Sequence, residues 1–143
     1  MRKNLYILLS LIFSGCAVSQ QNLAYETKIP TLPKKEYKRL SSKQLKGLKE
    51  YGIASFYGPK WNGRLTANGE RFNCNYLTAA HKYLPFNSLV KVTDLDTGKS
   101  VVVRINDRGP FVKGRIIDLT QAAAKKLGII NKGIARVKIE VVG

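Results

Sequence analysis

The stretch "VVVRINDRGPF", residues 101–111, joins a run of β-forming residues to a tight turn. Valine and isoleucine favour a strand, and the Gly-Pro pair that follows stops it. Asp107 therefore stands where a rigid strand gives way to a loop, a place where folds often present catalytic groups. An aspartate here also suits turn chemistry, in which it bonds back to the backbone or pairs with Arg104 or Arg108. The stretch itself leaves these two interpretations equally open.

Five more runs of β-forming residues follow the same pattern, each bounded by turn residues. An Asp-Thr-Gly segment between two of them is a hairpin signal. Six short strands in so small a domain favour a closed barrel, because closure removes exposed sheet edges. The five further strands are expected at residues 52–57, 77–81, 88–94, 115–119 and 134–142.

One short helix is expected among the strands, at residues 121–127. Asp118 or Thr120 can cap its first turn, and Gly128 can end it. Gln121 follows Asp118 at the spacing of a capping box. The fold class is therefore mainly β, a six-stranded barrel with one short helix.

The N-terminal region reads as an export signal followed by a linker. A positive start and a short apolar run fit a signal peptide over residues 1–15 better than a membrane-spanning helix. The segment "FSGC" at its end resembles a bacterial lipobox, in which Cys16 is acylated and becomes the new N-terminus. By resemblance to bacterial sorting rules, Ala17 indicates a lipid anchor at the periplasmic face of the outer membrane. Residues 16–50 are expected to be a flexible tether, and residues 51–143 the folded domain.

The chain is strongly basic, with 25 Lys and Arg against nine Asp and Glu and a formal net charge of +16 over 143 residues. Such a charge attracts polyanions. The export signal and the lack of alternating basic and aromatic residues argue against nucleic acid. We therefore expect anionic partners outside the inner membrane, namely phospholipid, lipopolysaccharide or the carboxylates of peptidoglycan.

Carboxylates are the remaining candidates for chemistry. The domain has one histidine, His81, and one cysteine, so it lacks the ligands for a zinc site, and it has no glycine-rich phosphate loop. We expect no metal and no cofactor. Glu70 follows an Asn-Gly turn, where it is either simply exposed or displayed at the rim of a cleft. Tyr57, Trp61 and Phe111 are candidates for sugar stacking, although core packing is the commoner fate of aromatic side chains.

Three longer stretches together resemble the rare lipoprotein A family: "GIASFYGPKWNGRLTANGERFN", "LTAAHKYLPFNSLVKVTDLDTGKSVVVRINDRGPF" and "GRIIDLTQAAAKKLGI". The resemblance covers residues 52–142. It implies a double-psi β-barrel and lytic transglycosylase activity on peptidoglycan, with a preference for glycan strands stripped of stem peptides. In that reaction the bond between N-acetylmuramic acid and N-acetylglucosamine is cleaved without water, and a 1,6-anhydro end forms.

The resemblance also implies roles for individual residues. The family's implicated acidic and imidazole positions fall on Asp107, Glu70 and His81. Asp107 would be the acid and base, Glu70 would polarise or position substrate, and His81 would complete the hydrogen-bond network. Tyr57 and Arg108 would line the groove and bind substrate.

A likeness to other wall-active barrels keeps alternatives open. The barrel is similar to expansins and to a group of endoglucanases, whose "FDLS"-like motif matches "IDLT" and makes Asp118 a second catalytic candidate. Family members often carry His and Asp where this chain has Asn62 and Asn73. Expansin-like barrels bind wall polymers without cutting them, so a non-catalytic binding or wall-tethering lipoprotein is the alternative function. The expected partners are peptidoglycan glycan strands, the membrane through the lipid, and cell-division or cell-wall proteins.

Overall fold

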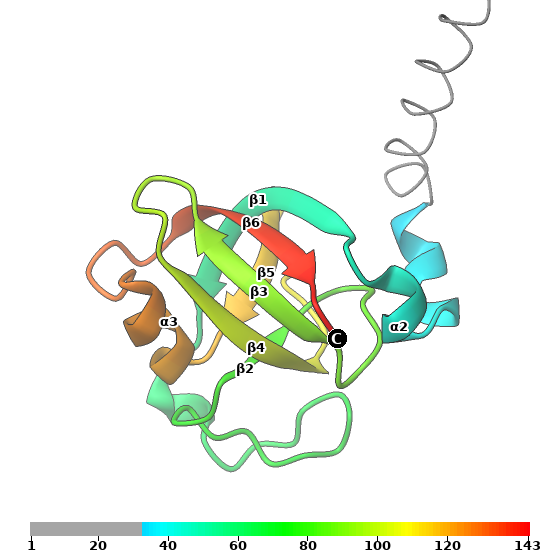
Figure 1. The fold of residues 1–143 in the computed structure, drawn as a ribbon. Helices are drawn as coiled ribbons and strands as arrows, with labels where there is room; N and C mark the ends of the chain where they lie inside the picture. Colours follow the sequence, from blue (N-terminus) through cyan, green and yellow to red (C-terminus); the bar gives the residue numbers. More distant parts are fainter. Residues whose placement is uncertain (1–32) are drawn as a thin grey trace, which may run out of the picture. The chain divides into compact units, whose positions relative to one another are not determined.

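Six strands close into a barrel with the order β1-β5-β2-β4-β3-β6 (Figure 1). The computed structural model describes residues 33–143. The predicted six-stranded barrel is confirmed, with every strand at its expected place. The strands are β1 (Lys49–Phe56), β2 (Thr78–Ala80), β3 (Leu89–Asp94), β4 (Ser100–Asp107), β5 (Arg115–Leu119) and β6 (Ala135–Val141).

The barrel mixes parallel and antiparallel neighbours. β1 runs parallel to β5, and β2 runs parallel to β4. The other four pairs, β1–β6, β2–β5, β3–β4 and β3–β6, are antiparallel. β2, only three residues long, therefore lies between β4 and β5, and this placement decides which side chains of those two strands meet.

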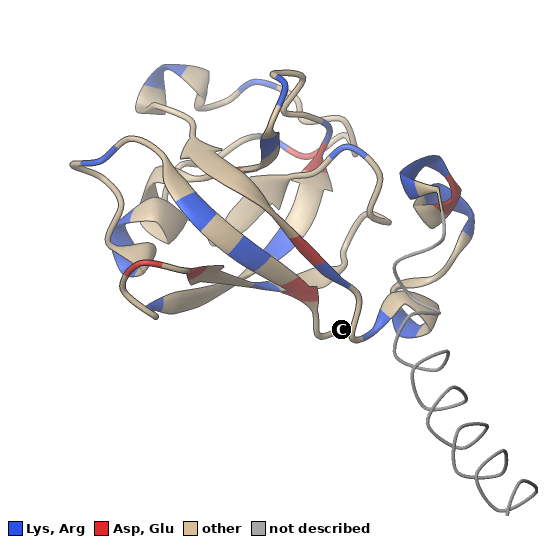
Figure 2. Cartoon of the chain, turned by 90° about the horizontal axis from the view of Figure 1, so that it is seen from above, with Lys and Arg blue, Asp and Glu red and all other residues tan. Residues whose placement is uncertain are grey.

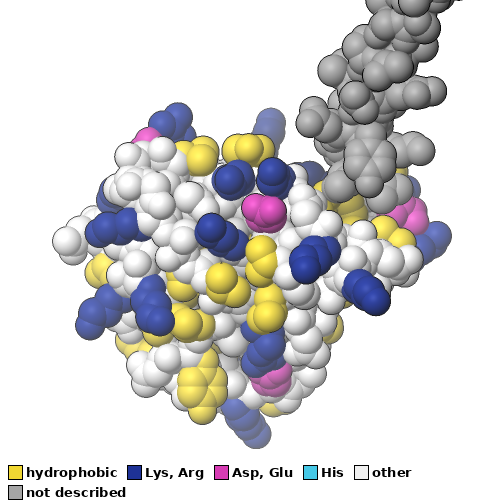
Figure 3. All heavy atoms as spheres, in the orientation of Figure 1, with side chains coloured by type: hydrophobic (Ala, Val, Ile, Leu, Met, Phe, Trp, Pro, Cys, Tyr) yellow, Lys and Arg dark blue, Asp and Glu magenta, His cyan; other side chains and the backbone are white. Residues whose placement is uncertain are grey.

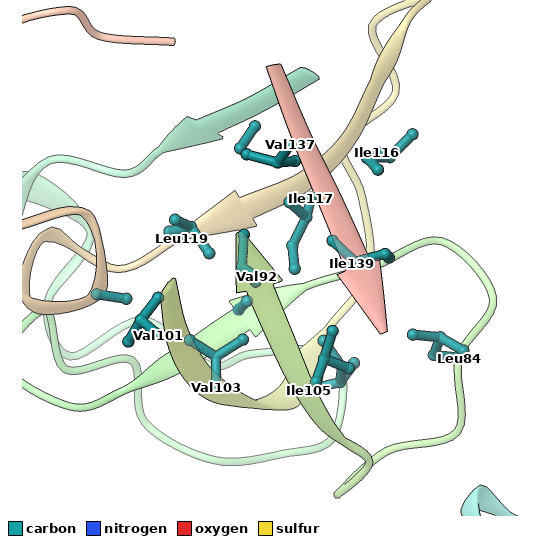
Figure 4. Packing of buried hydrophobic residues seen from close by; sticks show 14 of the residues in the cluster. Leu84, Val92, Val101, Val103, Ile105, Ile116, Ile117, Leu119, Val137 and Ile139 are labelled. Atoms are coloured by element: carbon teal, nitrogen blue, oxygen red, sulfur yellow. The ribbon is translucent and has the colours of Figure 1, made fainter. Parts of the chain in front are cut away.

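Alternate residues of the strands fill the barrel. In β4, Val101, Val103 and Ile105 are buried, whereas Val102 between them is exposed. Figure 4 shows these side chains meeting those of β3, β5 and β6 inside the barrel. The period of two is what a half-buried strand requires. Burying a Val, Ile or Leu side chain contributes about 1.5–3 kcal/mol, so this interior holds the rigid frame on which the site is built.

α3 (Gln121–Leu127) is the predicted helix, and Thr120 caps it. The Thr120 side chain accepts a hydrogen bond from a backbone amide of the first turn. Gly128 ends the helix with a φ of 82°, which glycine adopts without strain. The alternative prediction that Asp118 caps the helix is wrong. The strand continues through Leu119, so Asp118 lies within β5 and forms no capping box.

The segment before the barrel, residues 33–48, is folded against it and is called the arm. Tyr37, Leu45 and Leu48 are each at most 4% exposed and belong to the core. In Figure 1, α2 of the arm lies on the opposite side of the barrel from α3. Burial of these three apolar side chains is what holds the arm on the barrel. Its helices are η1 (Lys34–Arg39) and α2 (Ser42–Leu45).

The boundary expected between tether and domain differs from the structure. β1 begins at Lys49, and the compact unit comprises Pro33–Gly143, so it begins well before Tyr51. The apolar residues of the arm are too widely spaced to show a strand or helix period, yet Tyr37, Leu45 and Leu48 are buried and Leu40 packs against the core. The predicted signal peptide and the lipidation of Cys16 lie outside the described residues. Within residues 33–143, no helix has the length and apolar character to cross a membrane.

Candidate active site

A cleft of about 410 Å³ opens beside the turn that follows β4. Its walls come from the loop after β1, which includes η2 (Pro59–Trp61), from the turn after β4, and from β5. Two carboxylates line it, Asp107 and Asp118. Glu70 and His81 are not among its lining residues, so only two of the four predicted catalytic candidates line the cleft.

Asp107 and Asp118 face the same cleft, and β2 lies between the two strands that carry them, β4 and β5. Ala80 of β2 is the register partner of Asp107 on one side and of Asp118 on the other. Neighbouring strands are about 4.8 Å apart, so the two aspartates are held roughly 10 Å apart at their backbones. The rigid barrel thus presents two carboxyl groups to one cleft.

The carboxylate of Asp107 is oriented by the backbone. Its Oδ1 accepts hydrogen bonds from the amides of Ala67 and Arg108, at 2.9 and 2.8 Å. Neither of the arginines expected to pair with it forms an ion pair with Asp107, since Arg104 binds Glu70 and the Arg108 guanidinium binds backbone carbonyls. Turn chemistry and presentation in a cleft are therefore both realised at Asp107.

Asp118 is a different kind of carboxyl group. Burial raises its pKa, and the negative charge of Asp107 raises it further. A hydrogen bond from the Ser55 hydroxyl and the positive charge of Arg115 oppose this rise without cancelling it. A carboxyl group with a raised pKa holds its proton at higher pH, which is the property that a general acid needs.

Aromatic side chains form one wall of the cleft. The Tyr57 ring meets Phe72 edge to face at 5.5 Å and lies 6.2 Å from Trp61. The pKa of Tyr57 is raised by burial and then by the charges of Asp118 and Asp107, so its hydroxyl stays neutral. At the rim, Phe111 is 81% exposed. Flat apolar faces beside neutral hydroxyl groups suit stacking against sugar rings.

Glu70 supports the loop that contacts Asp107. Arg104 donates to both of its carboxylate oxygens, at 2.6 and 2.9 Å. These bonds, followed by those from Asn68 and Asn106, hold the pKa of Glu70 at about 2. The loop also carries Ala67, whose amide binds Asp107. In this structure Glu70 therefore reaches the cleft through the loop backbone and not through its own side chain.

His81 faces the arm side of the barrel, away from the carboxylates of the cleft. Its ring is 1% exposed, and its Nδ1 accepts hydrogen bonds from the amides of Tyr83 and Leu84, each at 3.0 Å. The ring proton therefore sits on Nε2, which donates to Glu50 at 3.0 Å. Burial alone would raise the pKa of Glu50, but the bonds from His81 and Lys34 outweigh it and lower that pKa.

The predicted substrate residue Arg108 lines the cleft but is held by the fold. Its guanidinium donates to the carbonyls of His81 and Leu84, at 3.2 and 2.9 Å, and lies 3.8 Å from the centre of the Phe86 ring. The other predicted substrate residue, Tyr57, lines the cleft as expected. The loop that follows β2 is thus tied to the turn after β4 through Arg108 and His81 together.

Sequence reasoning missed two arginines and one glutamate. Arg64 and Arg115 line the cleft, and Glu50 is the partly buried partner of His81. Arg115 could have been suspected from its position at the start of the strand that carries Asp118. Glu50 could have been sought as a partner of the single histidine of the chain, because a buried histidine needs a polar partner.

The fold and site define the class of protein. A family model described as lytic transglycolase matches residues 49–139, and the chain belongs to this family. The predicted double-psi β-barrel is thereby confirmed. Two solved structures share the fold at low sequence identity: the Streptomyces papain inhibitor, with a TM-score of 0.54, 21% identity and coverage of 66% of this chain and 94% of that chain, and an expansin of Clavibacter michiganensis, with a TM-score of 0.53, 22% identity and coverage of 66% and 50%.

Two relatives in sequence are much more similar to this chain than these solved structures are. A protein of Pasteurella multocida named endolytic peptidoglycan transglycosylase RlpA is 55% identical over 106 residues, which cover 74% of this chain and 36% of that protein. The protein of Vibrio cholerae with the same name is 58% identical over 100 residues, which cover 70% and 38%. The chain thus matches little more than a third of the length of these relatives.

Proposed function

We propose that this chain is a lytic transglycosylase that cleaves the bonds between N-acetylmuramic acid and N-acetylglucosamine in peptidoglycan glycan strands. The observation that carries the proposal is the pair of aspartates lining one cleft in a chain of the lytic transglycolase family. The names of the relatives support it. The basic surface (Figure 3) suits a wall polymer that bears carboxylates.

The proposed reaction is an intramolecular displacement. The 6-hydroxyl oxygen of the muramic residue attacks its own anomeric carbon, and the bond from that carbon to the leaving oxygen breaks. The leaving oxygen takes up a proton, and the 6-hydroxyl loses one. The products are a 1,6-anhydromuramic end and a new N-acetylglucosamine hydroxyl, and no water is consumed. Two proton transfers are therefore what the protein must supply.

The two aspartates suit these proton transfers. Asp118, whose pKa is raised by burial, donates a proton to the leaving oxygen. Asp107, whose carboxylate is oriented by the amides of Ala67 and Arg108, accepts the proton of the 6-hydroxyl and offsets the positive charge that develops at the anomeric carbon. This differs from the expectation that Asp107 alone serves as acid and base.

The other predicted residues act at a distance from the reacting bond. Glu70 positions Asp107 through the loop that carries Ala67. His81 orders the backbone after β2, whose carbonyls hold Arg108. Tyr57 offers its ring and hydroxyl to a sugar in the cleft. Glu70 and His81 are thus positioning residues, and their loss weakens cleavage less than the loss of either cleft aspartate.

The proposed cellular setting rests on the N-terminal sequence. A lipobox-like segment ending at Cys16 supports a lipid-anchored protein at the periplasmic face of the outer membrane. From there a tether of residues 17–32 would let the barrel reach the wall. Labelling cells with an alkyne fatty acid tests the anchor. The unchanged chain should become labelled and the Cys16→Ala chain should not. Label in both chains would refute lipidation at Cys16.

Purified full-length chain incubated with peptidoglycan sacculi, intact and stripped of stem peptides, tests the activity. We expect soluble fragments with anhydromuramic ends, detected by mass spectrometry. Asp107→Asn and Asp118→Asn should abolish them, while Lys126→Gln, a change of an exposed helix residue, should not. Full activity of Asp118→Asn would mean that Asp107 alone carries out both proton transfers. A chain that only sediments with the wall would support the expansin-like alternative.

A further inference from the structure

Two smaller hollows adjoin the active-site cleft on the side of the arm. The first, of about 260 Å³, shares Arg108 and Phe111 with the cleft. The second, of about 290 Å³, shares Arg115 with the cleft and Lys82 and Tyr83 with the first hollow. The three spaces therefore border one another across shared side chains. We call the two smaller ones together the arm-side groove.

The arm-side groove is basic. Lys38, Lys82 and Arg115 line it, and within residues 33–143 none of the three forms an ion pair. Its one carboxylate, Glu50, is already bound by His81 and Lys34. Figure 2 likewise shows several basic residues along the arm. Unpaired cations along a concave wall attract an anionic ligand, because the hollow focuses their field.

The arm builds part of this groove. Lys34 forms an ion pair with Glu50, and Tyr37 is 4% exposed in the core, so the arm has a fixed position on the barrel. That position brings Lys38 to the wall of the groove, with its Nζ 5.9 Å from the centre of the Tyr83 ring. The family match begins at residue 49, so this wall comes from the part of the chain that precedes the matched domain.

We propose that the arm-side groove binds a carboxylate of the nearest other muramic residue of the strand, one N-acetylglucosamine away from the residue being cleaved, and that the arm completes this subsite. The proposal rests on the proposed function, since it takes the ligand in the cleft to be a muramic glycan. A strand seated in the cleft continues past both of its ends, and the groove is the adjoining hollow that carries unpaired positive charge. The carboxylate belongs either to the lactyl group of a stripped strand or to a stem peptide.

Equilibrium binding to full-length chain carrying Asp107→Asn, which stops turnover, tests the groove. The ligands are a muramic oligosaccharide without peptides, the same oligosaccharide with its carboxyl groups reduced to alcohols, and its peptide-bearing form. Lys38→Gln with Lys82→Gln removes two groove cations, neither of which is buried. Lys91→Gln with Lys126→Gln is the charge-matched control, because both lysines are exposed and neither lines a groove wall.

We expect the parent protein to prefer a carboxylated ligand over the reduced one by about tenfold, the lower range for a hydrogen bond to a charged group. The groove variant should lose this preference and the control should keep it. Preference for the peptide-free ligand identifies the lactyl carboxylate, and preference for the peptide-bearing ligand alone identifies the stem peptide. An absent preference in the parent, or equal losses in groove variant and control, would overturn the proposal.

Cleavage by the chain with Asp107 intact is measured on the same ligands and reports on the proposed function alone. Absence of anhydromuramic products together with a groove-dependent preference would refute the transglycosylase and leave the groove as a carboxylate subsite of a binding module. Anhydromuramic products together with an unchanged preference in the groove variant would support the transglycosylase activity and refute the carboxylate subsite in the arm-side groove.

Discussion

The ion pair between Glu70 and Arg104 gives a quantitative test of how Glu70 supports the site. Arg104 donates to both carboxylate oxygens, and this pairing above all holds the Glu70 pKa at about 2, against an ordinary value of 4.5. One pKa unit corresponds to about 1.4 kcal/mol, so without screening the bonds to Glu70 would stabilise the fold by about 3 kcal/mol. The Glu70 side chain is 37% exposed, and solvent screening leaves about 1 kcal/mol.

The pH dependence of this stabilisation has a definite sign. The pKa of Glu70 is lower in the folded state than in the unfolded chain, so the stabilisation is fully present above about pH 4.5. It is lost as the pH falls through the folded value of about 2. Urea unfolding of the unchanged chain, Glu70→Gln, Arg104→Gln and the double variant measures it as the coupling free energy of a double-mutant cycle.

We expect a coupling of about 1 kcal/mol at pH 6 that disappears near pH 2, because protonation of Glu70 removes the ion pair. Hydrogen exchange at the Ala67 amide should quicken in Glu70→Gln, since the loop that binds Asp107 is loosened. A coupling that is absent at pH 6, or unchanged at pH 2, would refute the ion-pair reasoning. Unchanged exchange at Ala67 combined with lost cleavage would instead mean that Glu70 contacts substrate.

Three more changes probe the site and the elements that support the fold around it. Ser55→Ala removes a bond that lowers the pKa of Asp118, so the alkaline limb of the pH–rate profile should move to higher pH; a limb that stays or moves down would contradict Asp118 as the acid. His81→Ala leaves the partly buried Glu50 carboxylate with Lys34 alone and should cost about 3 kcal/mol in urea unfolding. A loss below about 1 kcal/mol, the scale of a surface pair, would show that the pair does not stabilise the fold. Thr120→Ala removes the cap of α3 and should cost about 1 kcal/mol, and an unchanged midpoint would rule the cap out.

The strands were predictable because turn residues separate them sharply. Short Val- and Ile-rich runs bounded by Gly, Pro and Asp fixed both the strand positions and the need for closure. The order of strands around the barrel was not predictable from these runs. The insertion of β2 between β4 and β5 is a long-range pairing, and no local pattern near Asp107 or Asp118 encodes it.

The candidate residues were chosen correctly as chemical types, but their partners were not foreseen. Glu70 was considered as a group at a cleft rim. The structure pairs it with Arg104, which had been predicted as a possible partner of Asp107. His81 was expected among the carboxylates of the site, and the structure pairs it with Glu50 near the arm. Each partner is far along the chain, so spacing gave no sign of it. The packing of the arm against the barrel was missed as well, because the buried residues of the arm follow no period.

The central claim is that glycan strands are cut by their own 6-hydroxyl group with Asp107 and Asp118 as the proton carriers. Full-length chain is incubated with stripped glycan strands in heavy-oxygen water, and the new ends are analysed by mass spectrometry. We predict anhydromuramic ends that carry no heavy oxygen and that are absent with Asp107→Asn or Asp118→Asn. Reducing ends that contain heavy oxygen would mean that water is the attacking group and would contradict the account.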